Sequence, residues 1–182
     1  MKHTSLFIAI AACALIFACG NKHSRQADLD NITRFEDSID IQNSIISVDN
    51  GNRLIDLYTT FATNHPDDTL APVYWHRAAQ VAANIHRPDI ALQYLDNVIA
   101  KYPDYKDVAV CAFYKGFVLE TVAGDMDAAR AAYQDFITNY PNDPLVKDAQ
   151  VSIENLGLSP EELLGKILSQ NSSGDSAIAE NK

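Results

Sequence analysis

The sequence of 182 residues predicts an all-α protein, a short α-solenoid in which antiparallel helix pairs stack on one another. Three observations support this prediction: motifs recur at a fixed interval, large apolar side chains follow helical spacing, and Gly or Pro stands where helices are expected to end. A fixed internal period of about 20 to 50 residues is typical of solenoids, whose repeats bury their apolar faces only against neighbouring repeats.

The repeat is clearest at Tyr102-Pro103, which recurs downstream as Tyr140-Pro141. The same offset relates other positions of the two segments, pairing Arg77 with Lys115, Ala78 with Gly116, Asp89 with Asp127, Ala91 with Ala129, Leu95 with Tyr133, Val98 with Phe136 and Ile99 with Ile137. An upstream copy, shorter by one position, lies at Leu54, Tyr58, Phe61 and Pro66. Three segments in phase predict three structurally related units.

The last complete unit shows why each repeat should be helical. Its larger apolar residues have the i, i+3, i+4, i+7 spacing of one helix face: Tyr133, Phe136, Ile137 and Tyr140. Gly124 can end the preceding helix, Asp125 can cap the next, and Pro141 stops it because proline lacks a backbone donor. Signals of this kind predict helices over 49–64, 70–84, 88–101, 107–122, 126–139 and 145–156.

A last helix is predicted over 160–168, since Ser159-Pro160-Glu161-Glu162 forms a capping box. Its apolar residues are expected to cover the open end of the stack: Leu163, Leu164, Ile167 and Leu168. Solenoids need such caps because an uncovered terminal repeat exposes its apolar face. The helical domain is therefore expected to span 48–168, followed by a polar, disordered tail over 169–182.

At these positions the chain resembles tetratricopeptide repeat (TPR) proteins. The first full repeat carries Tyr74, Ala78, Ala91, Leu95, Val98 and Pro103, and the second carries Ala112, Gly116, Gly124, Ala129, Tyr133, Phe136 and Pro141. Over about residues 48–157 the chain is similar to small TPR lipoproteins related to the Tol–Pal-associated division coordinator and to the lipoprotein of outer-membrane β-barrel assembly. The resemblance implies a groove, lined by the first helix of each pair, that receives a partner peptide.

The N-terminus has the form of a secretory signal, with Lys2 before an uncharged apolar run over 6–18. The run ends in Ile16-Phe17-Ala18-Cys19-Gly20, which resembles the bacterial lipobox. That resemblance implies cleavage of a signal peptide, residues 1–18, and acylation of Cys19. The alternative is an ordinary signal peptide with an incidental Cys. Residues 19–47 are then expected to form a lipidated, mostly disordered tether, in which Phe35, Ile39, Ile45 and Ile46 could form a short helix.

Composition and motifs exclude several classes of function. A net charge of −10 argues against nucleic-acid binding, which needs a basic stripe. After removal of the signal peptide and acylation of Cys19, Cys111 alone remains, and it is expected to be a small buried thiol rather than a nucleophile. His65, His76 and His86 lack metal-ligand spacing. The sequence therefore predicts no metal, no cofactor and no catalytic site.

Candidate groove residues lie on the predicted first helices. In one helical register Trp75, Ala79, Phe113, Phe117 and Glu120 face the groove, and in the other His76 and Gln80 do. Aromatic anchors suit a binding surface. The alternative is that the three aromatic residues Trp75, Phe113 and Phe117 belong to the core between helices.

These observations predict a non-catalytic interaction adaptor, tethered by lipid in the cell envelope, with the periplasmic face of the outer membrane as the expected location. Its expected partner is an envelope protein or a peptide segment. Two alternatives stay open: a structural lipoprotein that self-associates as a homo-oligomer, and an accessory surface lipoprotein that helps to bind glycans.

Overall fold

The computed structural model describes residues 24–39 and 46–179, with side chains described as far as Ser169. The expected signal peptide and the acylation site Cys19 lie outside the described residues. Within them the chain is entirely helical and contains no strand. In chain order the α-helices are α2 (Arg25–Ser38), α3 (Val48–Asn64), α4 (Ala71–Asn84), α5 (Pro88–Lys101), α6 (Val108–Val118), α7 (Met126–Asn139), α8 (Val146–Asn155) and α9 (Pro160–Ala179).

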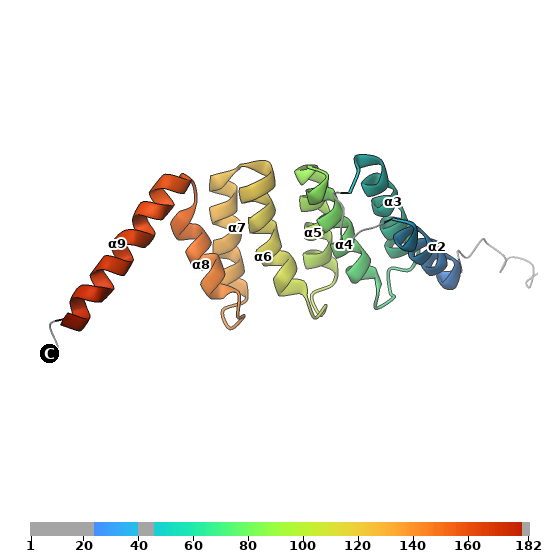
Figure 1. Ribbon diagram of the computed structural model, residues 1–182. Helices are drawn as coiled ribbons and strands as arrows, with labels where there is room; N and C mark the ends of the chain where they lie inside the picture. The colour runs from blue at the N-terminus through green and yellow to red at the C-terminus, as the bar shows by residue number, and fades with distance from the viewer. Residues whose placement is uncertain (1–23, 40–45, 180–182) are drawn as a thin grey trace, which may run out of the picture.

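Helices α2 to α8 stand side by side in one elongated row, and α9 projects from its end (Figure 1). Successive helices form the pairs α2–α3, α4–α5 and α6–α7, and α8 begins a further pair. The small positions of the repeat are fully buried: Ala78, Ala91 and Ala129. Large residues beside them fill the core, including Leu95, Tyr133 and Phe136. The predicted α-solenoid of antiparallel helix pairs is therefore confirmed.

The loops that join one pair to the next share one backbone conformation. The residue after α3, α5 and α7 has φ of −128° or −129° and ψ between 54° and 58° in His65, Tyr102 and Tyr140. Its carbonyl accepts a hydrogen bond of 3.0 Å from the N–H three residues later. That later residue is Asp68 or Asp143 in two loops, where its carboxylate accepts from the N–H of Leu70 or Leu145 at 2.9 Å. In the third loop it is Tyr105.

The first helix of the third pair ends differently from its prediction. The expected helix over 107–122 appears as α6, followed by a π-helical turn over Leu119–Ala123. The wider turn ends at Gly124, whose φ of 71° suits glycine because it has no Cβ. The carboxylate of Asp125 then accepts the N–H of Ala128 at 3.0 Å and caps α7, as predicted.

Gly116 sets the distance between α6 and α7. A Cβ added there would lie 2.6 Å from ring atoms of Tyr133, whose hydroxyl donates a 2.8 Å hydrogen bond to Glu120. We expect Gly116→Ala to lower the free energy of unfolding by about 1–3 kcal/mol, because overpacking forces helices or rings apart. Urea unfolding followed by circular dichroism measures the change.

Gly165→Ala in α9 is the matched control for this prediction. A Cβ at Gly165 meets nothing within 4 Å, so alanine should leave stability unchanged or raise it slightly. Equal losses in the two variants would contradict the tight contact at Gly116.

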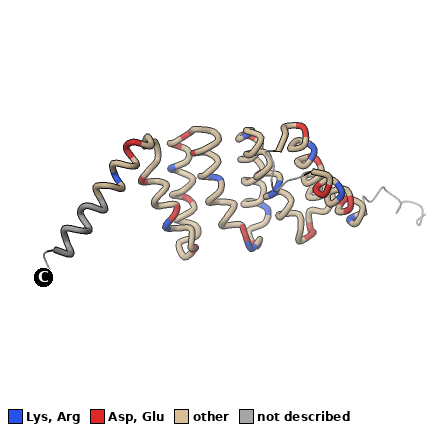
Figure 2. The backbone as a smooth tube through the Cα atoms, viewed as in Figure 1, with Lys and Arg blue, Asp and Glu red and all other residues tan. Residues whose placement is uncertain are grey.

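Helix α2 corrects the prediction of a mostly disordered tether over residues 19–47. Ile32 is 1% exposed and packs against residues of α3 and α4. Polar contacts also hold α2: the Tyr58 hydroxyl donates to Glu36 at 2.6 Å, and Asp28 lies 2.9 Å from Nε2 of His65. Arg25 makes two hydrogen bonds to Asp68. Figure 2 shows many charged residues around α2. The sequence of this helix is correspondingly polar and has few apolar residues that would predict it.

Helix α9 corrects two further predictions. It continues to Ala179, beyond the expected end at residue 168 and into the segment expected to be disordered. Its apolar residues do not cover the end of the stack, because four of them are exposed by 36% to 60%: Leu163, Leu164, Ile167 and Leu168. The Nζ of Lys166 donates instead to Oδ1 of Asn155 at 2.8 Å, which fixes the start of α9 beside the end of α8.

Candidate functional site

A row of aromatic side chains links α4 to α6 across the surface of the stack. The His76 ring of α4 lies 6.3 Å from the Tyr114 ring of α6 and 6.5 Å from Tyr105 in the loop between α5 and α6. Tyr114 in turn stacks on Phe117 at 5.7 Å, with an interplanar angle of 17°. These four residues, Tyr105, His76, Tyr114 and Phe117, are called the aromatic row.

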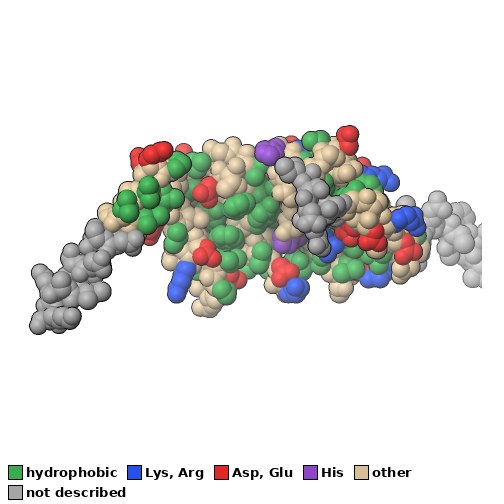
Figure 3. All heavy atoms as spheres, in the orientation of Figure 1, with side chains coloured by type: hydrophobic (Ala, Val, Ile, Leu, Met, Phe, Trp, Pro, Cys, Tyr) green, Lys and Arg blue, Asp and Glu red, His purple; other side chains and the backbone are tan. Residues whose placement is uncertain are grey.

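The row has an exposed end and a part-buried end. Phe117 is 42% exposed and Val110, on the same helix, is 38% exposed, whereas Tyr105, His76 and Tyr114 are half-buried. Residues 110, 114 and 117 follow the i, i+4, i+7 spacing of one helix face, so Val110 extends the row along α6. Figure 3 shows hydrophobic side chains gathered over the middle of the stack.

Burial within the aromatic row favours the uncharged forms of its titratable side chains, His76, Tyr105 and Tyr114. Burial lowers the pKa of His76 below its usual value, although nearby Asp107 opposes the shift. Burial raises the pKa of Tyr114, and burial together with a hydrogen bond to Asp107 raises the pKa of Tyr105. The imidazole and both phenols are therefore uncharged at neutral pH. A neutral aromatic surface binds apolar and aromatic groups with little desolvation cost.

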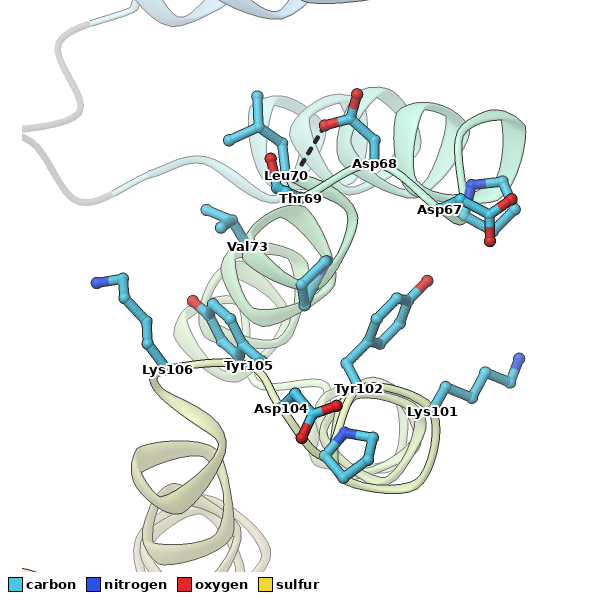
Figure 4. Close-up of a pocket in the computed structure, with 13 residues that line it drawn as sticks. Asp67, Asp68, Thr69, Leu70, Val73, Lys101, Tyr102, Asp104, Tyr105 and Lys106 are labelled. Atoms are coloured by element: carbon cyan, nitrogen blue, oxygen red, sulfur yellow. Dashed lines mark hydrogen bonds between the residues drawn. The ribbon is translucent and has the colours of Figure 1, made fainter.

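A cleft of about 840 Å³ adjoins the row at Tyr105. It lies between two successive loops, 66–70 and 102–106 (Figure 4). Its walls combine the Tyr102 and Tyr105 rings and apolar loop residues with charged groups of both signs, including Asp67, Asp104, Lys101 and Lys106. Because Tyr105 belongs to both features, the cleft and the aromatic row form one continuous surface.

One comparison with known proteins decides the type of repeat. Residues 111–143 match the family model of the tetratricopeptide repeat. The match covers most of α6 and all of α7, a single helix pair. No curated protein matches the chain. The described helices thus form a TPR-like α-solenoid, and TPR domains bind protein partners.

Two of the four candidate groove residues, Trp75 and Phe113, contact the second helix of their own pair rather than the aromatic row. The Phe113 ring lies 5.5 Å from Tyr133 and 5.6 Å from Phe136, both on α7, so the half-buried Phe113 packs against the core of the matched repeat. Trp75 is half-buried and its ring lies 5.2 Å from Tyr94 of α5. Both residues therefore lie outside the aromatic row, and their contact with a partner peptide stays a prediction.

The other two candidates have separate roles. Glu120, in the π-helical turn after α6, accepts the hydrogen bond from the Tyr133 hydroxyl, which ties this turn to α7. Phe117 lies on the row, at its exposed end. In the other helical register the candidates are His76 and Gln80, and His76 lies in the aromatic row. Gln80 is exposed beside it, with its Nε2 3.4 Å from Nε2 of His76.

Tyr105 and Tyr114 were missed by the sequence reasoning, although the repeat contains a signal for each. Tyr105 stands where the equivalent loops have Asp68 and Asp143, whose carboxylates accept a hydrogen bond from the N–H two residues later. Tyr114 occupies the position in the second full repeat that His76 occupies in the first. A repeat position at which one copy lacks the residue that the other copies use for a loop hydrogen bond is a good candidate for a functional contact.

The described residues offer no sign of metal chemistry or of a membrane span. Over 24–39 and 46–169, no three His, Cys, Asp or Glu side chains are placed to hold a metal ion. None of the helices described is long and apolar enough to cross a membrane. Cys111 is fully buried, and burial raises the pKa of its thiol to about 12, so it stays protonated at neutral pH.

Proposed function

We propose that the protein is a non-catalytic interaction adaptor, and that the aromatic row with its adjoining cleft receives a segment of a partner protein. The observation that carries the proposal is the exposed Phe117 ring stacked on Tyr114, at the surface of a repeat of a protein-binding type. Aromatic side chains supply a large share of the binding energy at protein interfaces.

The chemistry of the surface indicates the chemistry of the partner segment. The row is neutral and aromatic, so it suits apolar or aromatic side chains at spaced positions. The chain as a whole carries a net charge of −10, which favours a partner segment with basic residues through long-range attraction. An extended or helical peptide with apolar anchors and flanking Lys or Arg fits both properties.

We expect Phe117→Ala to abolish capture of this partner by the tagged full chain, while changing the free energy of unfolding by less than about 1 kcal/mol. Quantitative mass spectrometry of cross-linked envelope proteins measures capture, and thermal unfolding measures stability. Met126→Ala is the matched control, because Met126 is 38% exposed on α7 outside the row. Unchanged capture, or a large loss of stability in Phe117→Ala, would contradict the proposal.

The proposed location is the periplasmic face of the outer membrane, through acyl chains on Cys19. The support is the lipobox-like sequence that ends the predicted signal peptide. Several acyl chains anchor a protein stably, whereas one gives only marginal binding. Fractionation of Cys19→Ser tests the anchor: the variant should leave the membrane fraction, and retention there would refute lipid tethering through Cys19.

A further inference from the structure

The cleft between loops 66–70 and 102–106 is lined by rigid rings. Tyr102 and Tyr105 contribute aromatic rings, and three prolines belong to the same lining: Pro66, Pro72 and Pro103. Figure 4 shows the two tyrosines on the loop that faces Asp67 and Asp68 across the cleft. The volume of about 840 Å³ lies in the range of pockets that hold a drug-sized ligand, so it admits a few residues of a peptide.

The backbone around the cleft is not arranged to pair with a bound β-strand. Both loops consist of turns, in which the N–H of Asp68 and that of Tyr105 donate to the carbonyl three residues earlier at 3.0 Å. The N–H of Leu70 donates to the Asp68 carboxylate at 2.9 Å, as Figure 4 shows, and the prolines have no N–H. Strand addition requires an extended edge with free backbone groups. A segment bound in this cleft is therefore recognised mainly through its side chains.

A polyproline II segment meets this condition. It has no internal hydrogen bonds, and its backbone stays solvated while its rings contact the binding surface. Because it is ordered before it binds, it loses little conformational entropy, and aromatic-lined grooves recognise such segments for this reason. Tyr102 and Tyr105 provide aromatic faces of this kind. Burial raises the pKa of both phenols, so both are uncharged at neutral pH.

The charges of the cleft favour a basic side chain on that segment. Lys106 is paired with Asp107 at 3.1 Å, and Asp68 is paired with Arg25. The charged groups that remain in the lining are two carboxylates and one ammonium: Asp67, Asp104 and Lys101. None of these three is in an ion pair with another described residue. An added cation is therefore attracted to this part of the cleft.

Tyr102 is the position where a cation would meet both carboxylates. Figure 4 shows its ring between Asp67 and Asp104, with the Lys101 side chain reaching outward. Burial raises the pKa of Tyr102, and the negative charge of Asp67 adds to this shift. The Trp75 indole N–H donates to the Tyr102 hydroxyl and so fixes the ring. A guanidinium or ammonium group over this ring gains a cation–π contact together with charge attraction.

We propose that the cleft receives a proline-containing segment of the partner protein in the polyproline II conformation, with an Arg or Lys side chain on Tyr102 between Asp67 and Asp104. The inference rests on the proposed function, since the cleft joins the aromatic row at Tyr105. It adds the conformation of the bound segment and the residue types that the cleft selects.

The test is a titration of the full chain, in mild detergent, with the capped peptide Pro-Pro-Arg-Pro-Pro. The fluorescence of Trp75 reports binding, because Trp75 is the sole tryptophan of the chain and donates to Tyr102. Isothermal titration calorimetry gives the dissociation constant independently. The Arg peptide should bind saturably. Peptides with Glu in place of Arg, or with Gly in place of every Pro, should each bind about tenfold more weakly or worse.

Asp67→Asn combined with Asp104→Asn should raise the dissociation constant of the Arg peptide about tenfold, because two exposed charge attractions are lost. Asp127→Asn combined with Asp135→Asn is the matched control. Both control residues are exposed on α7 outside the cleft, so this pair should leave binding unchanged. Circular dichroism checks that both double variants stay folded.

Equal binding of the Arg and Glu peptides, equal binding of the proline and glycine peptides, or no binding by either method would overturn the proposal. So would equal effects of the two double variants. Its failure is distinguishable from that of the proposed function. If Phe117→Ala abolishes partner capture while the native chain binds none of the peptides, the aromatic row stays the partner surface and the inference about the cleft alone is wrong.

Discussion

Phe136→Ala is expected to lower the free energy of unfolding by about 3–5 kcal/mol, the largest loss of any single substitution proposed for this chain. Phe136 is 1% exposed and its ring lies 5.6 Å from Phe113 and 5.7 Å from Tyr140. Truncation leaves a cavity in the one helix pair that matches the TPR model, and the neighbouring rings cannot fill it fully. Chemical unfolding followed by circular dichroism measures the loss.

Phe117→Ala serves as the comparison, because it removes the same side chain from the neighbouring helix at a position that is 42% exposed. Its expected cost is below about 1 kcal/mol. Similar losses in the two variants would show that Phe117 is a core residue, and the aromatic row would then lose its exposed end.

Ile32→Ala is expected to cost about 2–5 kcal/mol and to release α2 from the stack. Ile32 is 1% exposed, in contact with the cluster of α3 and α4 residues that includes Leu54 and Tyr58. Loss of this contact also weakens the Tyr58–Glu36 hydrogen bond, which depends on the position of α2. Thermal unfolding gives the stability, and limited proteolysis reports cleavage within 25–38.

Thr33→Ala is the control for this prediction, since Thr33 is the exposed neighbour of Ile32 and alanine favours helices. It should leave both stability and proteolysis unchanged. If Ile32→Ala behaved in the same way, α2 would contribute nothing to the fold, and the original expectation of a tether over these residues would be restored.

The helix pairs were largely predictable because their signals are local. The helices predicted over 88–101 and 126–139 have those bounds in the structure, as α5 and α7. Each begins at a Pro or behind an Asp cap and ends at a Tyr-Pro, so its limits depend on the chemistry of adjacent residues.

Helix α2 was anticipated only as a possible short helix that includes Phe35 and Ile39, and its full extent over Arg25–Ser38 was not predicted because its stability is not local. Its sequence is polar, and only Asp28 and Ile32 are buried. The contacts that hold it come from residues far along the chain, such as Asp68, which is 43 residues from its partner Arg25. Its apolar face is narrow, with Leu29, Ile32, Phe35 and Ile39 packed against the cluster of α3 and α4 residues, so apolar periodicity gives only a weak signal for it.

The candidate surface was predicted only in part, because helical spacing does not determine which neighbour a face meets. Trp75 and Phe113 occupy equivalent positions in successive repeats, and both point toward the second helix of their own pair. Phe117 lies one turn beyond Phe113 and stacks on Tyr114 instead. The prediction that the last helix covers the end of the stack was wrong for a related reason. The leucines of α9 form an amphipathic pattern, but the connection after α8 directs their face outward.

The central claim is that the aromatic row is the surface that meets a partner, and site-specific photo-crosslinking in living cells tests it most directly. A photoreactive amino acid replaces Phe117 in one full-length variant and Gln93, which is exposed on α5 outside the row, in another. The account predicts one recurrent adduct from position 117, its loss when Tyr114→Ala is added, and no such adduct from position 93. Equal adducts from both positions, or an adduct at 117 that survives Tyr114→Ala, would contradict it.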